Sequence, residues 1–279
     1  DPREEYVACA SALASGEAAA REDLRIVLTA MHGVGAAITS RVLAEAGFSN
    51  VSLVEAQAQP DPDFPTVPFP NPEEAGALDM AIEQAREQGA DLIIAVDPDA
   101  DRCALAVPDP SSETGWSPLS GDQTGSLLGE FLASRGMRGS LANSIVSSRL
   151  LSRIAHAHGL EHHTTLTGFK WIARAPGLGF GYEEAIGFCP DPAHVRDKDG
   201  IATSVVAASL VAALKAQGRS VWDELERLAR LHGLHVSSPL TFRVEEIEQI
   251  ASGMARLRAQ PPSVLAGSPV VEVSDLSQG

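Results

Sequence analysis

Three aspartates alternate along one short stretch of the chain. Asp97, Asp99 and Asp101 stand at every second position, and Arg102 follows them directly. Alternate side chains of an extended loop share a face, so the three carboxylates can converge on one point. A hard divalent cation with oxygen ligands, Mg²⁺ as the first expectation, would relieve their repulsion. The guanidinium of Arg102 suits bidentate contacts to phosphate.

The element that positions this loop is the apolar run 92–96. It is short and continuously hydrophobic, which is typical of a buried strand in an α/β sheet. The acidic loop then lies at the carboxyl end of the strand, where open α/β sheets bind ligands. A solvated turn is the alternative, because Asp-Pro is a common turn signal. An EF-hand is excluded, because its sixth and twelfth positions are Arg102 and Pro108 instead of Gly and Glu.

The string Asp-Pro-Asp-Ala-Asp-Arg at 97–102 resembles the metal-binding loop of the α-D-phosphohexomutase superfamily. That family includes phosphoglucomutases, phosphomannomutases and phosphopentomutases. The resemblance implies that Asp97, Asp99 and Asp101 bind Mg²⁺. It also implies that Arg102 is an active-site cation near the transferred phosphoryl group.

A second motif, Thr-Gly-Phe-Lys-Trp-Ile at 167–172, resembles a loop in the third domain of the same family. Gly168 permits a sharp turn, and Lys170 would project from a helix N-terminus. From the residues alone, Lys170 could equally be solvated, as most lysines are. The resemblance implies that Lys170 faces a phosphosugar, binding phosphate or assisting proton transfer, with Gly168 and Phe169 in the binding loop.

The segment Gly-Tyr-Glu-Glu-Ala-Ile-Gly at 181–187 resembles the sugar-specificity loop of the family. Adjacent glutamates in an extended segment point in opposite directions, so one can reach a ligand while the other serves the structure. The resemblance matches Glu183 to the glutamate that binds sugar hydroxyls. Ala185 replaces the usual serine and removes one hydroxyl contact, which leaves the preference among mannose, glucose and pentose open.

The charged segment 194–200 combines a titratable histidine with two cations before a predicted helix. Such a group can bind an anion at a helix N-terminus, although a charged loop is often only solvated. The resemblance implies a substrate contact for Arg196. It also makes His194 and Lys198 alternative candidates for general acid/base work on the sugar hydroxyl, and the sequence does not choose between them.

Composition limits the partners. The formal net charge is -16, which argues against nucleic acid and anionic membranes but permits a local phosphosugar site. The three cysteines are widely spaced and form no zinc motif or disulfide framework, so we expect a cytoplasmic protein. We also expect no signal peptide at the start of this sequence, and no apolar run in it is long enough to span a bilayer.

The element pattern predicts an α/β protein: two consecutive α/β domains with mixed sheets flanked by helices, and a partial C-terminal domain. The predicted limits are 1–116, 117–236 and 237–279, matching the second, third and incomplete fourth domains of the family. Within them we expect a helix that starts at Asn71 and stops at Gly89, a strand from Leu240 to Val244 and a helix over 245–258.

Two motifs of the resembling family are missing from the sequence: the Ser-His loop that carries a phosphorylated serine and the Arg-Pro-Ser-Gly-Thr-Glu-Pro phosphate cradle. We therefore expect a fragment that is inactive by itself. The complete protein would be a Mg²⁺-dependent phosphomannomutase or phosphoglucomutase, an isomerase that moves phosphoryl between C1 and C6 through a bisphosphorylated sugar. The alternatives are a phosphopentomutase and a non-catalytic protein that binds sugar phosphate or metal. A metal-dependent phosphatase would leave the loops of Lys170, Glu183 and Lys198 unexplained.

Overall fold

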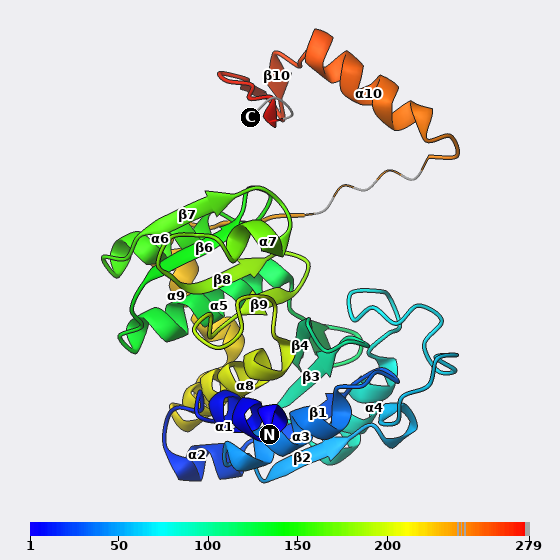
Figure 1. Ribbon diagram of the computed structural model, residues 1–279, viewed down its shortest axis with the longest axis vertical. Helices are drawn as coiled ribbons and strands as arrows, with labels where there is room; N and C mark the ends of the chain where they lie inside the picture. Colours follow the sequence, from blue (N-terminus) through cyan, green and yellow to red (C-terminus); the bar gives the residue numbers. More distant parts are fainter. Residues whose placement is uncertain (239, 241, 243, 277–279) are drawn as a thin grey trace. The chain divides into compact units, whose positions relative to one another are not determined.

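The computed structural model describes residues 1–238, 240, 242 and 244–276. The chain divides into two compact units, Asp1–Ser237 and Ser238–Gly279. The first unit contains two sheets with their flanking helices, which Figure 1 shows in blue to yellow. The second contains helix α10 (Glu248–Ala259) and a short hairpin of β10 (Val264–Leu265) and β11 (Ser268–Pro269).

The first sheet carries the acidic loop. Its strand order is β2-β1-β3-β4-β5. Strands β2, β1 and β3 run parallel, and β4 and β5 continue the sheet antiparallel. All five residues of β3 are buried, as the continuous apolar run predicts, which requires cover on both faces. The bounds are β1 (Arg25–Thr29), β2 (Asn50–Leu53), β3 (Leu92–Val96), β4 (Cys103–Pro108) and β5 (Trp116–Pro118).

Helices cover this sheet. Helix α4 (Asp79–Gln88) packs against β1 and β3. The long α8 (Gly200–Ala216) packs against β3 and β4, and three shorter helices pack against α8: α1 (Pro2–Ser11), α2 (Ala18–Asp23) and α3 (Ala36–Glu45) (Figure 1). Its Ala- and Val-rich sequence is apolar all round, as expected for a helix buried on several sides. The same helix also packs against the strand Gly187–Cys189 and the helix Gly121–Ser134, so it contacts elements from both predicted domains.

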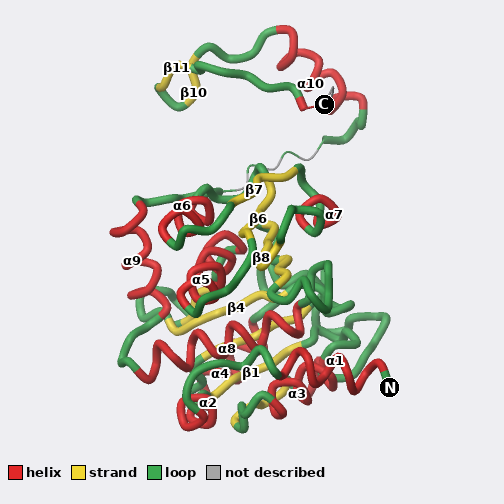
Figure 2. The backbone as a smooth tube through the Cα atoms, turned by 60° about the vertical axis from the view of Figure 1, so that its left-hand side comes forward, coloured by secondary structure: helices red, strands yellow, loops and turns green. Residues whose placement is uncertain are grey.

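The second sheet has the order β7-β6-β8-β9, with β9 antiparallel to β8 and the other neighbours parallel. Helices α5 and α6 pack against each other and against the strands, and α7 also packs against the strands (Figure 2). Helix α9 packs on α5 and α6. The bounds are β6 (Ser140–Ser144), β7 (His162–Thr165), β8 (Leu178–Glu183), β9 (Gly187–Cys189), α5 (Gly121–Ser134), α6 (Leu150–Ala157), α7 (Phe169–Ile172) and α9 (Val221–His232).

The predicted helix start at Asn71 is wrong. Helix α4 begins at Asp79, and residues 72–78 form turns. The side-chain oxygen of Asn71 does accept the backbone N–H of Glu73 at 3.2 Å, but this bond closes a local turn instead of capping a helix. At the other end Gly89 stops the helix in the left-handed conformation, with φ 58°, as predicted.

Two further predictions concern the second unit. The predicted helix over 245–258 is present, shifted to Glu248–Ala259. The strand predicted from Leu240 to Val244 falls partly outside the described residues, because 241 and 243 are not described.

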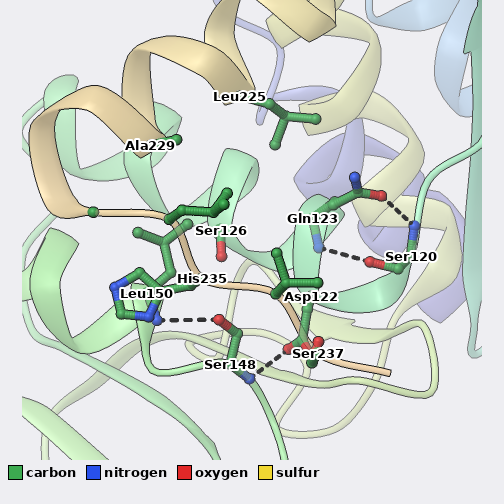
Figure 3. A pocket seen from close by; sticks show the side chains of 13 residues that line it. Ser120, Asp122, Gln123, Ser126, Ser148, Leu150, Leu225, Ala229, His235 and Ser237 are labelled. Atoms are coloured by element: carbon green, nitrogen blue, oxygen red, sulfur yellow. Dashed lines mark hydrogen bonds between the residues drawn. The ribbon is translucent and has the colours of Figure 1, made fainter. Parts of the chain in front are cut away.

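A cavity of about 300 Å³ lies between α5, the start of α6 and residues 233–237 (Figure 3). Asp122 lines it and accepts hydrogen bonds from the backbone N–H of Ser148 at 2.7 Å and the hydroxyl of Tyr182 at 2.8 Å. It also accepts a hydrogen bond from Ser237. Asp122 therefore ties several segments together, and Ser120 is the residue that caps α5.

Among the described residues, no single helix is long and apolar enough to cross a membrane. Helices α8 and α9 pass that test only when taken together, across a bend of 92°.

Candidate active site

The acidic loop follows β3 and brings its three carboxylates together. One ligand atom from each of Asp97, Asp99 and Asp101 lies within 4.8 Å of the other two. Asp97 is buried, Asp99 is exposed, and Asp101 is intermediate. Three carboxylate oxygens at this spacing are the hard donors that a small divalent cation prefers. The residues present therefore fit a divalent metal ion.

Two close backbone contacts shape this loop. Ala100 adopts φ 60°, and its N–H donates to the carbonyl of Asp97 at 2.9 Å. The turn after β1 contacts the acidic loop directly: the N–H of Val34 donates to the carbonyl of Pro98 at 2.9 Å. A Cβ at Gly33 would lie 2.3 Å from the Cα of Pro98, so only glycine fits there. The turn at residues 32–35, which contains Gly33 and Gly35, thus packs against the acidic loop and holds Pro98 in place.

The sugar-loop segment of the second sheet is joined directly to the acidic loop. Arg102 forms an isolated antiparallel bridge with Gly187, and the N–H of Cys103 donates to the carbonyl of Ile186 at 3.1 Å. The N–H of Gly200, at the start of α8, donates to the carbonyl of Ala100 at 3.1 Å. Three segments that are distant in the sequence therefore meet around one loop.

Lys198 links the acidic loop to the sugar loop. Its Nζ lies 2.9 Å from Oδ2 of Asp101 and 3.8 Å from Oε1 of Glu183. Burial lowers the pKa of Lys198, but the ion pair with Asp101 outweighs it and raises the pKa overall. Burial raises the pKa of Glu183, and the nearby ammonium of Lys198 offsets part of the rise. The amine of Lys198 thus stays protonated, with the carboxyl group of Glu183 beside it.

Arg102 is held by Asp97 through both carboxylate oxygens. Its Nε donates to Oδ2 at 2.6 Å, and its backbone N–H donates to Oδ1 at 2.9 Å. Burial raises the pKa of Asp97, and the bonds from Arg102 counter that rise only in part. The side chain of Arg102 keeps 26% of its surface exposed, so the guanidinium can still meet an anion.

Glu184 has a structural role that the sequence suggested for one of the two adjacent glutamates. Its Oε2 accepts hydrogen bonds from the hydroxyls of Ser144 and Ser147, each at 2.8 Å. Nothing in the local sequence marks the two serines as its partners, because they come from the end of β6 and the loop after it. Ala185 lies in the same turn and is half-buried.

Across the described part of the chain, five other predicted site residues form no hydrogen bond or ion pair with the acidic loop, Glu183 or Lys198. Lys170 is exposed, with its Nζ 5.7 Å from the ring centroid of Trp171, and Phe169 is buried in a small hydrophobic cluster. His194 pairs with Asp191 at 2.6 Å and is largely exposed. The other two are Gly168, with φ 108°, and Arg196, which is exposed.

One residue that the sequence did not single out for the site is Asn71. Its side-chain oxygen lies 3.4 Å from Nη1 of Arg102. It comes from the Pro-rich segment between β2 and α4, and its only signal in the sequence is a turn or helix-cap pattern.

Comparison with known proteins gives consistent matches over most of the first unit. Residues 4–111 match the family described as phosphoglucomutase/phosphomannomutase, alpha/beta/alpha domain II. Residues 120–231 match alpha/beta/alpha domain III of the same family.

Individual proteins similar to this chain carry names from the same family. A Haemophilus influenzae protein named "Probable phosphomannomutase" is 46% identical over 255 residues, covering 91% of this chain and 52% of the relative. A Staphylococcus aureus phosphoglucomutase is 34% identical over 268 residues, covering 91% of this chain and 48% of the relative. A solved Thermus thermophilus structure assigned as a phosphomannomutase superposes with a TM-score of 0.71 at 26% identity, covering 84% of this chain and 52% of that one. The chain spans about half the length of the curated relatives it matches.

Proposed function

The chain belongs to the phosphoglucomutase/phosphomannomutase family, and from that premise we propose that it forms the metal-binding and sugar-binding part of a phosphosugar mutase. The complete protein would transfer phosphoryl reversibly between the C1 and C6 oxygens of a hexose phosphate, through a phosphoserine and a bisphosphorylated sugar. The alternative is a phosphopentomutase, in which the second oxygen belongs to C5.

One observation carries this proposal. A single amine, Nζ of Lys198, lies next to both Asp101 of the acidic loop and Glu183 of the sugar loop. A solvated acidic turn or a metal site used for stability alone would not require this link. The link supports a site that holds a charged phosphoryl group on one side and sugar hydroxyls on the other.

Each residue then has a task. Asp97, Asp99 and Asp101 would hold Mg²⁺, which when bound would balance the negative charge of the phosphorylated serine. Arg102 would stabilise the phosphoryl group during transfer. Glu183 would accept hydrogen bonds from sugar hydroxyls, as a carboxylate does when it recognises a sugar.

For the acid/base role we choose Lys198 over His194. Lys198 is half-buried between two carboxylates, whereas His194 is more than half exposed and pairs with Asp191. The remaining predicted contacts to phosphate come from two exposed side chains, Lys170 of α7 and Arg196 of the loop before α8. The domain limits 1–116, 117–236 and 237–279 also remain part of this proposal.

The test uses the complete native polypeptide that contains this chain. Mannose 1-phosphate, glucose 1-phosphate and ribose 1-phosphate are supplied separately with Mg²⁺ and a trace of the matching bisphosphate, and products are identified by ³¹P NMR. We expect the 6-phosphate of a hexose, or the 5-phosphate of ribose if the alternative holds. Binding of sugar phosphate without conversion of any of the three would contradict the enzymatic proposal and favour a binding protein.

A further inference from the structure

We propose that Asn71 is a positioning residue for Arg102, and that residues 60–78 form an arm that carries it to the site. The inference rests on the proposed function, because it concerns how Arg102 is aimed at a transferring phosphoryl group. The sequence predicted a helix start at Asn71. The structure instead places its side chain against the guanidinium of Arg102.

Three contacts restrain Arg102. Asp97 accepts from its backbone N–H and from Nε, and Asn71 accepts from Nη1 at 3.4 Å. Within the described ranges no acceptor is hydrogen-bonded to Nη2. A guanidinium is planar, so contacts at Nε and Nη1 fix the direction of the third nitrogen. That nitrogen is therefore available to an anion in a defined orientation.

The orientation of Asn71 is itself defined by local bonds. Its Oδ1 accepts the N–H of Glu73 at 3.2 Å, and its own N–H donates to the carbonyl of Phe69 at 2.8 Å. Pro72, which follows it, is buried and has a restricted φ. The amide oxygen thus receives two donors, one from its own turn and one from Arg102.

The arm is anchored at the carboxyl end of β1. The hydroxyl of Thr66 lies 2.8 Å from Nε2 of His32 and accepts Nε2 of Gln57 at 3.0 Å. The N–H of Asp61 donates to the carbonyl of His32 at 3.0 Å. A small buried cluster secures the same segment, and its members are Met31, Val67 and Ala77.

The charge near Asn71 also favours this arrangement. Partial burial raises the pKa of Glu73, and the guanidinium of Arg102 offsets part of that rise. Residues 71–73 therefore bring one hydrogen-bond acceptor to Arg102 and one carboxylate close enough to interact with its charge. Because Asp97 already neutralises Arg102 at close range, the contact with Asn71 serves the direction of the guanidinium more than its charge.

Two substitutions separate positioning from a purely structural role. Asn71→Ser keeps a side-chain oxygen that can close the local turn, but its side chain is too short to reach Arg102. Asn71→Asp keeps both the turn and an acceptor for Arg102. Asp63→Asn changes an exposed residue of the same arm that makes no side-chain contact with Arg102 and is the matched control.

The first readout is ¹⁵N NMR of the Arg102 side chain in this chain, assigned with Arg102→Lys. We expect separate, slowly exchanging Nη signals in the wild type, Asn71→Asp and Asp63→Asn, and averaged signals in Asn71→Ser. The second readout is the mutase kinetics of the complete polypeptide. We expect kcat to fall on the order of tenfold in Asn71→Ser, with KM and the melting temperature nearly unchanged, and to recover in Asn71→Asp.

Two results would overturn the inference: wild-type Nη signals in Asn71→Ser, or equal losses of kcat in Asn71→Ser and Asn71→Asp. A lowered melting temperature with unchanged Arg102 signals would show that Asn71 only stabilises the arm. If the wild-type polypeptide converts no sugar phosphate, the proposed function fails, and the NMR comparison still decides whether Asn71 directs Arg102.

Discussion

Within the acidic loop, two of the three carboxylates already have cationic partners from the chain itself. Asp97 bonds to Arg102, and Asp101 pairs with Lys198. Asp99 is the exposed member of the group. A metal ion that enters this site therefore competes with an ammonium for Asp101 but not for Asp99. Asp99 is accordingly the best position at which to test metal binding.

We predict that Asp99→Asn weakens the binding of Mn²⁺ to this chain by about tenfold or more, because one of three anionic ligands becomes neutral. Isothermal titration with Mn²⁺ alone measures the effect. Asp63→Asn, which removes an exposed acid elsewhere, should leave the affinity unchanged. Equal affinities for the wild type and Asp99→Asn would exclude the acidic loop as the metal site.

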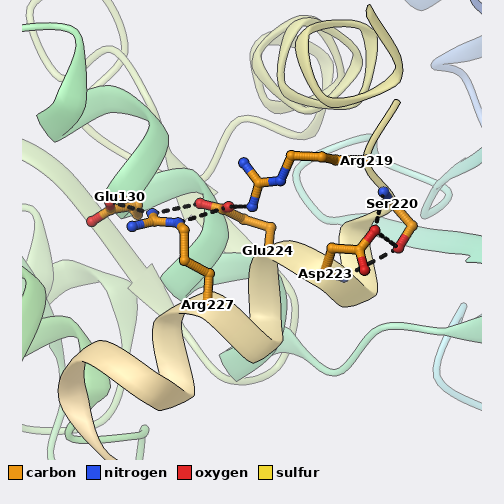
Figure 4. Close-up of polar contacts among 6 residues, drawn as sticks. All are labelled: Glu130, Arg219, Ser220, Asp223, Glu224 and Arg227. Carbon is orange, nitrogen blue, oxygen red and sulfur yellow. Dashed lines mark hydrogen bonds and ion pairs between the residues drawn. The ribbon is translucent and has the colours of Figure 1, made fainter. Parts of the chain in front are cut away.

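A second charged cluster, away from the acidic loop, joins α9 to α5 (Figure 4). Nη2 of Arg227 lies 2.6 Å from both Glu130 and Glu224, and Arg219 also bonds to Glu224. Glu224 is only 8% exposed. Burial raises its pKa, but the two guanidiniums outweigh burial and bring it below the ordinary value. Breaking one partner of a buried pair leaves an uncompensated charge, which is costly.

We predict that Glu224→Gln lowers the free energy of unfolding at neutral pH by about 1–3 kcal/mol. Because the folded-state pKa lies below the ordinary value of 4.5, this contribution is present above that pH and is lost as pH falls through the folded-state pKa. Urea unfolding should therefore show that the difference in the free energy of unfolding between Glu224→Gln and the wild type is smaller at low pH than at pH 7. Glu226→Gln, on the exposed face of α9, should cost less than about 0.5 kcal/mol. A pH-independent difference would contradict the ion-pair explanation.

The close contact between the turn after β1 and Pro98 helps to fix the shape of the acidic loop. We predict that Gly33→Ala destabilises the protein by about 2–4 kcal/mol and weakens Mn²⁺ binding, because the added methyl group would overlap Pro98. Thermal unfolding and Mn²⁺ titration measure the two effects. Gly16→Ala is a control for general loss of stability, since it meets no atom within 4 Å but has a positive φ. Normal metal binding in Gly33→Ala would show that this contact is not needed.

Most helices and strands of the first unit could be predicted from the sequence, because an apolar run or a glycine that ends a helix is a signal within a few neighbouring residues. Strand β3, helix α8 and the stop of α4 at Gly89 are examples. The start of α4 was not predictable, because a cap signal at Asn71 was equally compatible with a turn. The link between Lys198 and Asp101 was not predictable either, since it depends on a bridge between Arg102, just before β4, and Gly187 of β9.

At the scale of the first unit, one hydrophobic core runs through both sheets. It includes Leu28 of the first sheet, Phe180 of the second and Val205 of α8, all fully buried. The chain matches two family domains, yet Asp1–Ser237 forms a single compact unit. A core shared in this way should make the two sheets unfold together.

We predict that Leu28→Ala lowers the free energy of unfolding by about 2–5 kcal/mol, the usual cost of a buried leucine. Hydrogen exchange followed by mass spectrometry should show faster exchange in β6 and β8 as well as in β1 and β3. Leu234→Ala, at a largely exposed position, should leave exchange in both sheets unchanged. Faster exchange confined to the first sheet would mean that the sheets are separate folding units.

We propose that the acidic loop and the segment 183–198 form one site for metal and phosphosugar. The most direct test is a crystal structure of the complete polypeptide with Mn²⁺ and glucose 1,6-bisphosphate, measured at the Mn absorption edge. We expect one anomalous peak bound by Asp97, Asp99 and Asp101, with a phosphoryl group beside Arg102 and sugar hydroxyls at Glu183. A metal peak elsewhere, or a bisphosphate bound away from these residues, would contradict it.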